Sequence, residues 1–132
     1  MGAEKMGAEK MGQSAWRAFS LKHEIETQQG SGSPYREFLR VPSLSCGIYS
    51  LPKGSSDLQA PHDEDEVYYV VMGRARVRVD DEEKTVGPGS ILFVPATAEH
   101  SFCEIEEDLT LLVFFASGGP PGQPTPRERQ ER

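Results

Sequence analysis

The sequence predicts an all-β, single-domain fold that closes as a sandwich or barrel. Short runs rich in β-branched and aromatic residues follow one another at close spacing, and turns containing glycine or proline separate them. No amphipathic helical pattern of about ten residues or more interrupts these runs. The length of 132 residues suits one domain. Many short strands joined by such turns are typical of sandwiches and closed barrels.

The first half of the chain contributes the following predicted elements. Trp16–Leu21 is a candidate short edge strand. The glycine- and serine-rich stretch 28–34 predicts a loop. Glu37–Val41 and Leu44–Tyr49 predict two further strands.

The second half continues the series of strands. The run 67–71 is β-branched and aromatic and ends at Gly73, so Met72–Arg74 predicts a tight connection to a second strand at 75–80. In that second strand, small or apolar residues alternate with charged ones, and Arg74, Arg76 and Arg78 are expected to face water. Polar and glycine-proline turns follow at 80–83 and 86–89. The remaining predicted strands are 90–94, which is short and buried, 101–105 and 109–115.

The two ends of the chain are predicted to lie outside the folded domain, which we expect to span residues 13–116. The five residues Met1–Lys5 are repeated at Met6–Lys10, and such a repeat is too short to be a structural unit. We interpret residues 1–12 as a start-site duplication, a cloning remnant or a disordered extension. Residues 117–132 are rich in proline and charge and lack an apolar pattern, which predicts a disordered tail.

Composition disfavours several classes of function. The formal net charge of -7 repels phosphate backbones and anionic bilayers, so we expect neither nucleic acid nor membrane as a partner. The chain has no apolar run long enough to span a bilayer and no secretory signal pattern. Cys46 and Cys103 are far apart and form no CxxC pair, which indicates two reduced thiols rather than a disulfide framework. These features predict a cytoplasmic protein.

Three residues are the candidate metal ligands: His62, Glu66 and His100. Two imidazoles and one carboxylate can hold a divalent metal and leave coordination positions open. Because strand side chains alternate, Glu66 shares a face with Tyr68, Val70 and Met72, and by the same rule His100 shares one with Phe102 and Glu104.

An ionised glutamate inside a barrel is costly unless it is paired or bound to metal. The alternative is that His62 and Glu66 bond each other and His100 is an ordinary interior histidine.

Other polar and aromatic residues have plainer interpretations. The acidic run Asp63–Glu66 lacks the spacing of a calcium loop and predicts a solvated turn in which only Glu66 points inward. His23 stands in a polar stretch and is expected to be exposed. Four phenylalanines could line a substrate pocket or belong to the core, namely Phe93, Phe102, Phe114 and Phe115.

Two segments resemble the motifs of the cupin superfamily. The first motif is Gly, His-x-His, three or four residues, Glu, six residues and Gly. Glu66 and Gly73 have this spacing within 54–73, His62 falls on the second histidine, and Ala60 stands at the first.

The second cupin motif falls on residues 89–104. Gly89, Pro95 and His100 match it, whereas Thr97 replaces a glycine and Glu104 replaces an asparagine.

The resemblance implies a double-stranded β-helix, the cupin jelly-roll barrel of the small single-domain (cupin 2) type, often dimeric, with a metal inside. Cupins usually hold Fe, Mn, Ni, Zn or Cu through three histidines and one glutamate. Ala60 departs from that pattern. Either the site survives as two histidines and one glutamate, with an extra open position, or the loss marks a cupin that holds metal weakly.

We therefore expect a small metal-dependent enzyme, dioxygenase-like, that acts on a small organic molecule. His62, Glu66 and His100 would hold a divalent metal (Fe, Mn, Ni or Zn), and Tyr68 would donate a proton or hydrogen bond to substrate. A non-catalytic cupin that binds a small molecule or metal is the alternative. Sugar isomerase chemistry ranks last because no lysine or arginine is expected inside. A homodimer is implied, with Trp16–Leu21 as a natural pairing edge.

Overall fold

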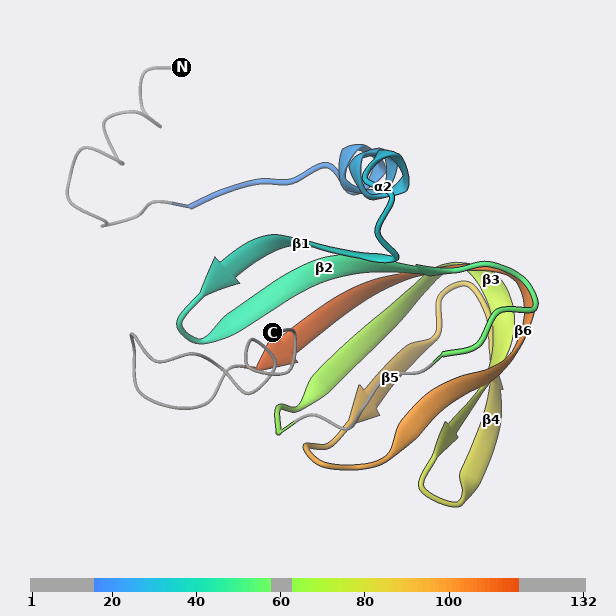
Figure 1. Ribbon diagram of the computed structural model, residues 1–132. Coiled ribbons are helices and arrows are strands. Elements are labelled where there is room, and N and C mark those ends of the chain that lie inside the picture. Colours follow the sequence, from blue (N-terminus) through green and yellow to red (C-terminus); the bar gives the residue numbers. More distant parts are fainter. Residues whose placement is uncertain (1–15, 58–62, 117–132) are drawn as a thin grey trace, which may run out of the picture.

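The computed structural model describes residues 16–57 and 63–116 (Figure 1). The predictions made for residues 1–12 and 117–132 lie outside the described residues, and so does His62. No helix within the described ranges is long and apolar enough to cross a bilayer.

The described residues form one helix and six strands. In chain order they are α2 (Leu21–Gly30), β1 (Tyr35–Val41), β2 (Leu44–Leu51), β3 (Glu66–Val79), β4 (Glu82–Val86), β5 (Ile91–Val94) and β6 (His100–Ala116). Neighbouring strands in the sheet follow the order β1-β2-β6-β3-β4. Strand β5 lies outside this order and pairs with β3. Every pairing is antiparallel. This arrangement confirms the predicted all-β class.

The two long strands β3 and β6 pair with each other at the centre of the sheet. Glu66 pairs with Phe115 at one end of their ladder, and Val79 pairs with His100 at the other. The first half of β3 also carries β5, and the second half carries β4. Both long strands bend midway, so that the two halves of the sheet curl over one another (Figure 1).

A bend in one continuous strand replaces the predicted connection at Met72–Arg74. That prediction was wrong, because β3 runs through these residues, although the β3–β6 register shifts on both sides of Met72. Gly73 has φ +100. A Cβ there would collide with the carbonyl oxygen of Asp108 and lie 2.7 Å from the Cα of Leu109. Glycine is therefore required both by its φ and by the close approach of β6.

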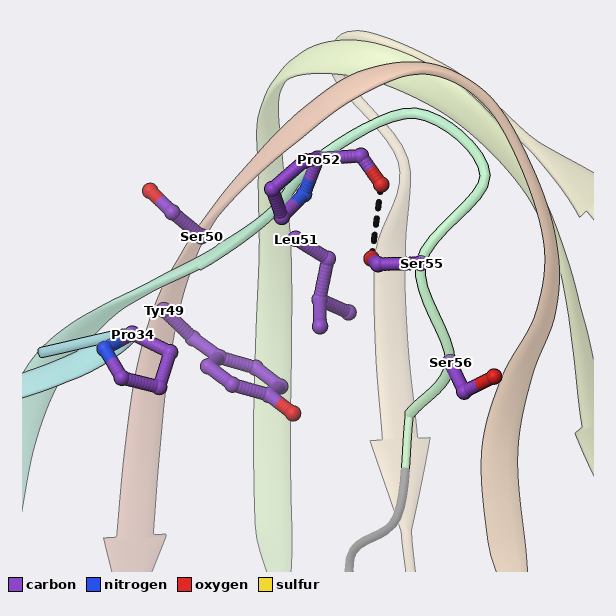
Figure 2. A pocket seen from close by; sticks show the side chains of 7 residues that line it. All are labelled: Pro34, Tyr49, Ser50, Leu51, Pro52, Ser55 and Ser56. Atoms are coloured by element: carbon purple, nitrogen blue, oxygen red, sulfur yellow. Dashed lines mark hydrogen bonds between the residues drawn. The ribbon is translucent and has the colours of Figure 1, made fainter.

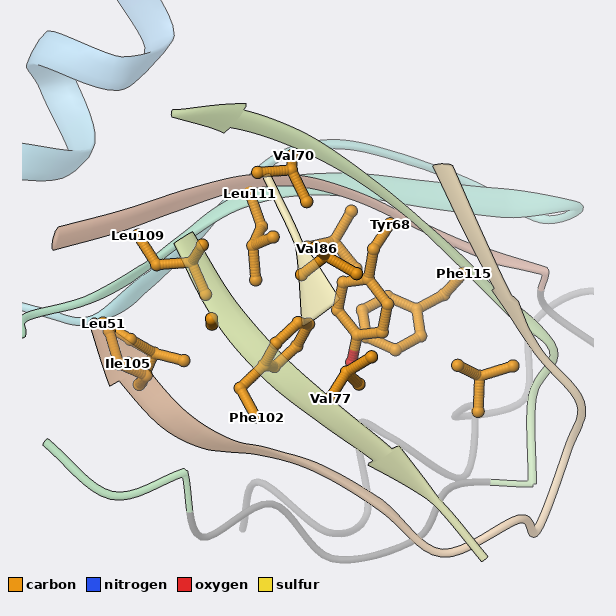
Figure 3. Close-up of a cluster of buried hydrophobic side chains, with 13 residues drawn as sticks. Leu51, Tyr68, Val70, Val77, Val86, Phe102, Ile105, Leu109, Leu111 and Phe115 are labelled. Atoms are coloured by element: carbon orange, nitrogen blue, oxygen red, sulfur yellow. The ribbon is translucent and has the colours of Figure 1, made fainter. Parts of the chain in front are cut away.

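The segments 101–105 and 109–115 likewise belong to one strand, β6, rather than two. Side chains from both long strands fill the space between the two halves of the sheet, together with Leu51, Val86 and Val94 (Figure 3). Tyr68 and Phe102 are the largest fully buried side chains in the described part of the chain. Their rings meet edge to face at 5.2 Å, a favourable arrangement for aromatic pairs.

The prediction of an edge strand at Trp16–Leu21 and of no ten-residue helix was wrong. Residues 16–20 form no strand, and α2 follows them over ten residues. The side chain of Ser20 accepts a hydrogen bond from the backbone N–H of His23, and therefore caps the helix. Only Glu24, Ile25 and Gln28 of α2 are buried, so its apolar pattern is too short to stand out in the sequence.

Helix α2 lies over the outer side of β1 and β2 (Figure 1). The Ser50 hydroxyl donates to the Gln28 side-chain oxygen at 2.8 Å, and the Glu24 carboxylate pairs with Arg36 at 3.0 Å. These contacts attach the helix to the outer face, opposite the barrel interior.

Candidate functional site

Glu66, Tyr68 and His100 form a buried polar cluster inside the barrel. Tyr68 donates to Glu66 Oε2 at 2.8 Å, and His100 Nε2 lies 3.0 Å from Glu66 Oε1. The distance from His100 Nε2 to the Tyr68 hydroxyl is 3.1 Å. The side chains of Glu66 and His100 are each 1% exposed, and Tyr68 is fully buried. The cluster therefore lies out of contact with bulk water.

Strand alternation places two of these residues, and the bend of the sheet places the third. Glu66 and Tyr68 occupy successive inward positions at the start of β3, as the sequence predicted. His100 begins β6 and pairs with Val79, at the far end of the β3–β6 ladder. A flat ladder of that length would separate Glu66 from Val79 by about 40 Å. The bend instead brings the Glu66 carboxylate against the His100 ring.

The His100 ring is fixed from both sides. Its Nδ1 lies 3.0 Å from the carbonyl oxygen of Ala98, so Nδ1 donates there and Nε2 faces Glu66. Burial lowers the pKa of His100, but the hydrogen bonds and charge of Glu66 and the Ala98 carbonyl outweigh it and raise the pKa above its ordinary value. The contact with the Glu66 carboxylate therefore favours the protonated form of the ring.

The predictions of which side chains share the inward face are correct near the cluster and wrong farther from it. Val70 and Phe102 are buried with their predicted partners, whereas Met72 and Glu104 are exposed. The register shifts of β3 against β6 lie between these positions and reverse the alternation.

The acidic run also differs from its prediction, because Glu64 is buried as well as Glu66.

Two of the three predicted metal ligands lie together in the structure. Glu66 and His100 are in contact, and Tyr68 joins them, while His62 lies outside the described residues. Within the ranges 16–57 and 63–116, no group of three histidine, cysteine, aspartate or glutamate side chains has the geometry of a metal site. The described part of the site is thus one carboxylate, one imidazole and one phenol.

Asp57 is a site residue that the sequence analysis missed. Its Oδ1 accepts from the Tyr49 hydroxyl at 2.8 Å, and its Oδ2 accepts from the backbone N–H of Phe102 at 2.8 Å. Burial of Tyr49, followed by the charge and hydrogen bond of Asp57, raises the pKa of this phenol strongly. Asp57 therefore ties β2 to β6 two residues beyond His100. Nothing in the local sequence marks this aspartate, because both partners are distant along the chain.

A hollow of about 400 Å³ lies beside this contact. Tyr49 and Leu51 point into it from β2, and Ser55 and Ser56 border it from the loop that follows (Figure 2). Pro34, Ser50 and Pro52 complete the lining. The hollow is large enough for a small organic molecule.

The remaining predictions for individual side chains have mixed outcomes. His23 is exposed, as predicted. The three arginines of β3 pair with glutamates on neighbouring strands: Arg74 with Glu106, Arg76 with Glu83 and Glu104, and Arg78 with Glu83.

The four phenylalanines divide into two groups. Phe102 and Phe115 belong to the core, whereas Phe93 and Phe114 are exposed. Within the described part of the chain, the latter two neither belong to the core nor border the hollow beside Tyr49.

Comparison with known proteins identifies the family. A model of the cupin domain matches residues 47–115. An uncharacterized protein of Streptomyces coelicolor is 44% identical over 101 residues, which cover 76% of this chain and 95% of that protein. The crystal structure of TT1209 from Thermus thermophilus is 25% identical, with a TM-score of 0.61, over 76% of this chain and 97% of that one.

Salicylate 1,2-dioxygenase from Pseudaminobacter salicylatoxidans is a structural neighbour of lower sequence identity. It is 16% identical with a TM-score of 0.63, over 74% of this chain and 34% of the larger one. The bent antiparallel barrel with polar side chains inside defines the class as a small jelly-roll β-barrel protein. The chain belongs to the cupin family.

Proposed function

We propose that this protein is a metal-binding cupin in which Glu66 and His100, together with His62, hold a divalent metal. The supporting observation is the convergence of two metal-binding atoms inside the barrel. Glu66 Oε1 lies 3.0 Å from His100 Nε2, and both side chains are 1% exposed. Buried carboxylates are costly unless a cation or hydrogen-bond donors satisfy them.

The donor set fits such a metal. Glu66 Oε1 and His100 Nε2 already converge, and the bond from Nδ1 to the Ala98 carbonyl is the usual way a metal-binding histidine is oriented. His100 Nε2 would release its proton on binding. Two imidazoles and one carboxylate with open positions suit non-haem Fe(II) oxygenases and also accept Mn, Ni or Zn.

The chemistry we propose is dioxygenase-like oxidation of a small organic substrate. Fe(II) in such a triad would supply binding positions for both O2 and substrate. Tyr68 holds its proton against Glu66 Oε2, where it is positioned to donate a hydrogen bond to a bound molecule. The hollow beside Tyr49 would admit the substrate, and the buried core around the cluster would exclude water.

Metal analysis tests the binding proposal. Protein purified from its native host should contain near-stoichiometric metal, and Glu66→Gln and His100→Ala should lose it. His23→Ala is the matched control, because His23 is exposed on α2 and should leave the metal content unchanged. Metal-free protein whose stability is unaffected by chelation would contradict the proposal.

Oxygen consumption separates the enzyme from a non-catalytic binding module. With Fe(II) loaded, a screen of small organic molecules should reveal turnover, and Tyr68→Phe should reduce turnover while retaining metal and the ring contact with Phe102. Retained metal without turnover under every metal loading would instead assign the protein as a binding module.

A further inference from the structure

The first half of β6 has strand support along one edge only. Strand β3 pairs with it between His100 and Glu107, whereas β2 pairs with β6 only from Leu109 onward. The β3–β6 ladder is also irregular here, because its register shifts between Arg76 and Val77. Among the described residues, strand pairing alone therefore leaves one edge of β6 open close to His100.

The loop that follows β2 runs along this open edge in place of a strand (Figure 2). The backbone N–H of Gly54 donates to the carbonyl oxygen of Ile105 at 3.0 Å. At the far end of the loop, Asp57 Oδ2 accepts from the backbone N–H of Phe102 at 2.8 Å. The Asp57 carboxylate thus takes the place that a backbone carbonyl of a neighbouring strand would have.

The Asp57 side chain is itself held on both sides. It is buried, and its Oδ1 accepts from the Tyr49 hydroxyl on β2 while its Oδ2 accepts from Phe102 on β6. Hydrogen bonds to an ionised acceptor are stronger than those between neutral groups. The carboxylate therefore cannot rotate without breaking a bond to one of two strands, and it fixes the distance between them.

Phe102 connects this contact to the polar cluster by two routes. Along the backbone, Phe102 lies two residues after His100, and both side chains are buried on the inward face. Through its ring, Phe102 meets Tyr68 edge to face at 5.2 Å, and the Tyr68 hydroxyl contacts both Glu66 and His100. A displacement of Phe102 would therefore alter the geometry between His100 and Glu66.

We propose that Asp57 is a positioning residue of the metal site, which fixes Phe102 and thereby the approach of His100 to Glu66. This inference rests on the proposed function, in which these two side chains hold a divalent metal. Asp57 acts through its neighbours and is not itself a ligand. Loss of a partner that orients a metal ligand typically costs about 10–100-fold in metal affinity.

Two substitutions separate the position of this carboxylate from its charge. Asp57→Asn removes the charge, but the amide can still accept from the Phe102 N–H and donate to the Tyr49 oxygen. Asp57→Glu keeps the charge but displaces the carboxylate by one methylene. In competition titrations of Zn²⁺ against a chelator, Asp57→Asn should stay within about threefold of the wild-type dissociation constant, and Asp57→Glu should raise it by at least about tenfold.

Asp108→Glu is the matched control. The Asp108 carboxylate accepts from the backbone N–H of Lys53 at 2.8 Å, so it attaches the same loop to the same strand. Asp108 is exposed and lies at the other end of the open edge from His100. The same lengthening of the side chain should therefore leave the Zn²⁺ dissociation constant within about threefold of the wild type.

The ring nitrogens of His100 supply a second measurement that needs no metal. Their ¹⁵N chemical shifts in metal-free protein report the contacts of Nδ1 with Ala98 and of Nε2 with Glu66. These shifts should move in Asp57→Glu and stay near the wild type in Asp57→Asn and Asp108→Glu. Thermal melts verify folding, and Asp57→Ser, which is too short to reach the Phe102 N–H, replaces Asp57→Glu if that variant does not fold.

Two results would overturn the proposal. One is wild-type Zn²⁺ affinity and wild-type ring shifts in Asp57→Glu. The other is an Asp57→Asn variant as weak as Asp57→Glu, because charge and not position would then explain the effect. A wild type that binds neither Zn²⁺ nor Fe²⁺ would instead count against the proposed function, and the ring shifts would still decide whether Asp57 fixes His100.

Discussion

Replacement of Gly73 by alanine tests the bend of β3. Gly73 has φ +100, and an alanine Cβ would collide with backbone atoms of Asp108 and Leu109 rather than with a movable side chain. A left-handed conformation costs a non-glycine residue about 1–2 kcal/mol. Overpacking adds about 1–3 kcal/mol, and the reduced freedom of the unfolded chain returns about 0.4–1 kcal/mol. These contributions sum to about 1–5 kcal/mol, and we expect Gly73→Ala to lower the free energy of unfolding by about 3 kcal/mol, the middle of that range.

Two other glycines separate these contributions. Gly54 has φ +77 but, among the described residues, no atom within 4 Å of an added Cβ, so Gly54→Ala should show the conformational cost alone, about 1 kcal/mol. Gly87 has no positive φ, and its added Cβ would lie 3.8 Å from Arg74 Cγ, which is an ordinary contact. Gly87→Ala should therefore stay within about 0.5 kcal/mol of the wild type.

Urea unfolding followed by circular dichroism measures all three variants under one protocol. The expected order of destabilisation is Gly73→Ala, then Gly54→Ala, then Gly87→Ala. For a domain of this size, Gly73→Ala should lower the melting temperature by at least about 8 °C. Equal values for Gly73→Ala and Gly54→Ala would refute the argument, because they would mean that the close approach of β6 costs nothing.

Three further predictions concern Asp57, Tyr49 and the two cysteines. Asp57→Ala should lower the free energy of unfolding by about 2–4 kcal/mol, because it leaves the Tyr49 hydroxyl and the Phe102 N–H without their acceptor. Asp57→Asn should recover part of this loss. An unchanged denaturation midpoint for Asp57→Ala would contradict the prediction. Because the pKa of Tyr49 is raised from 10.0 in the folded state, its contribution to stability is complete below pH 10.0 and declines as the pH rises above that value. Alkaline unfolding curves should therefore be less steep for Tyr49→Phe than for the wild type, and identical slopes would contradict this. Cys103 is exposed, whereas Cys46 is buried and its pKa is raised by burial and then by the charge of Glu37. A thiol reagent should therefore label only Cys103 until the protein unfolds. Mass spectrometry after proteolysis measures the labelling, and a labelled Cys46 in the native protein would contradict the prediction.

Elements with strong local signals could be predicted from the sequence. The alternating and β-branched runs correctly located β2, the two halves of β3, and β5, because side-chain alternation is a property of the strand itself. The inward positions of Glu66 and Tyr68 followed from the same rule. The family was identified from motif spacing, and the comparisons confirm it.

Features set by distant contacts could not be predicted. Gly73 was interpreted as a turn because a glycine after a strand has the same local signal whether the chain reverses or bends through a bulge. Helix α2 was missed because its stability derives from contacts with β1 and β2, such as Gln28 with Ser50, rather than from a long apolar stripe. Asp57 was missed for the same reason, since both of its partners lie far along the chain.

The bend of the sheet at Gly73 brings the residues of the candidate site together. Glu66 and His100 lie at opposite ends of one ladder, and they meet only because β3 and β6 fold over at the bulges around Gly73. Side chains of the core then fill the bend and hold it (Figure 3). The buried acid–imidazole contact is therefore a property of the closed barrel and not of either motif alone. It follows that a substitution at Gly73, which touches none of the three cluster residues, should disturb their geometry through the register of β3 against β6.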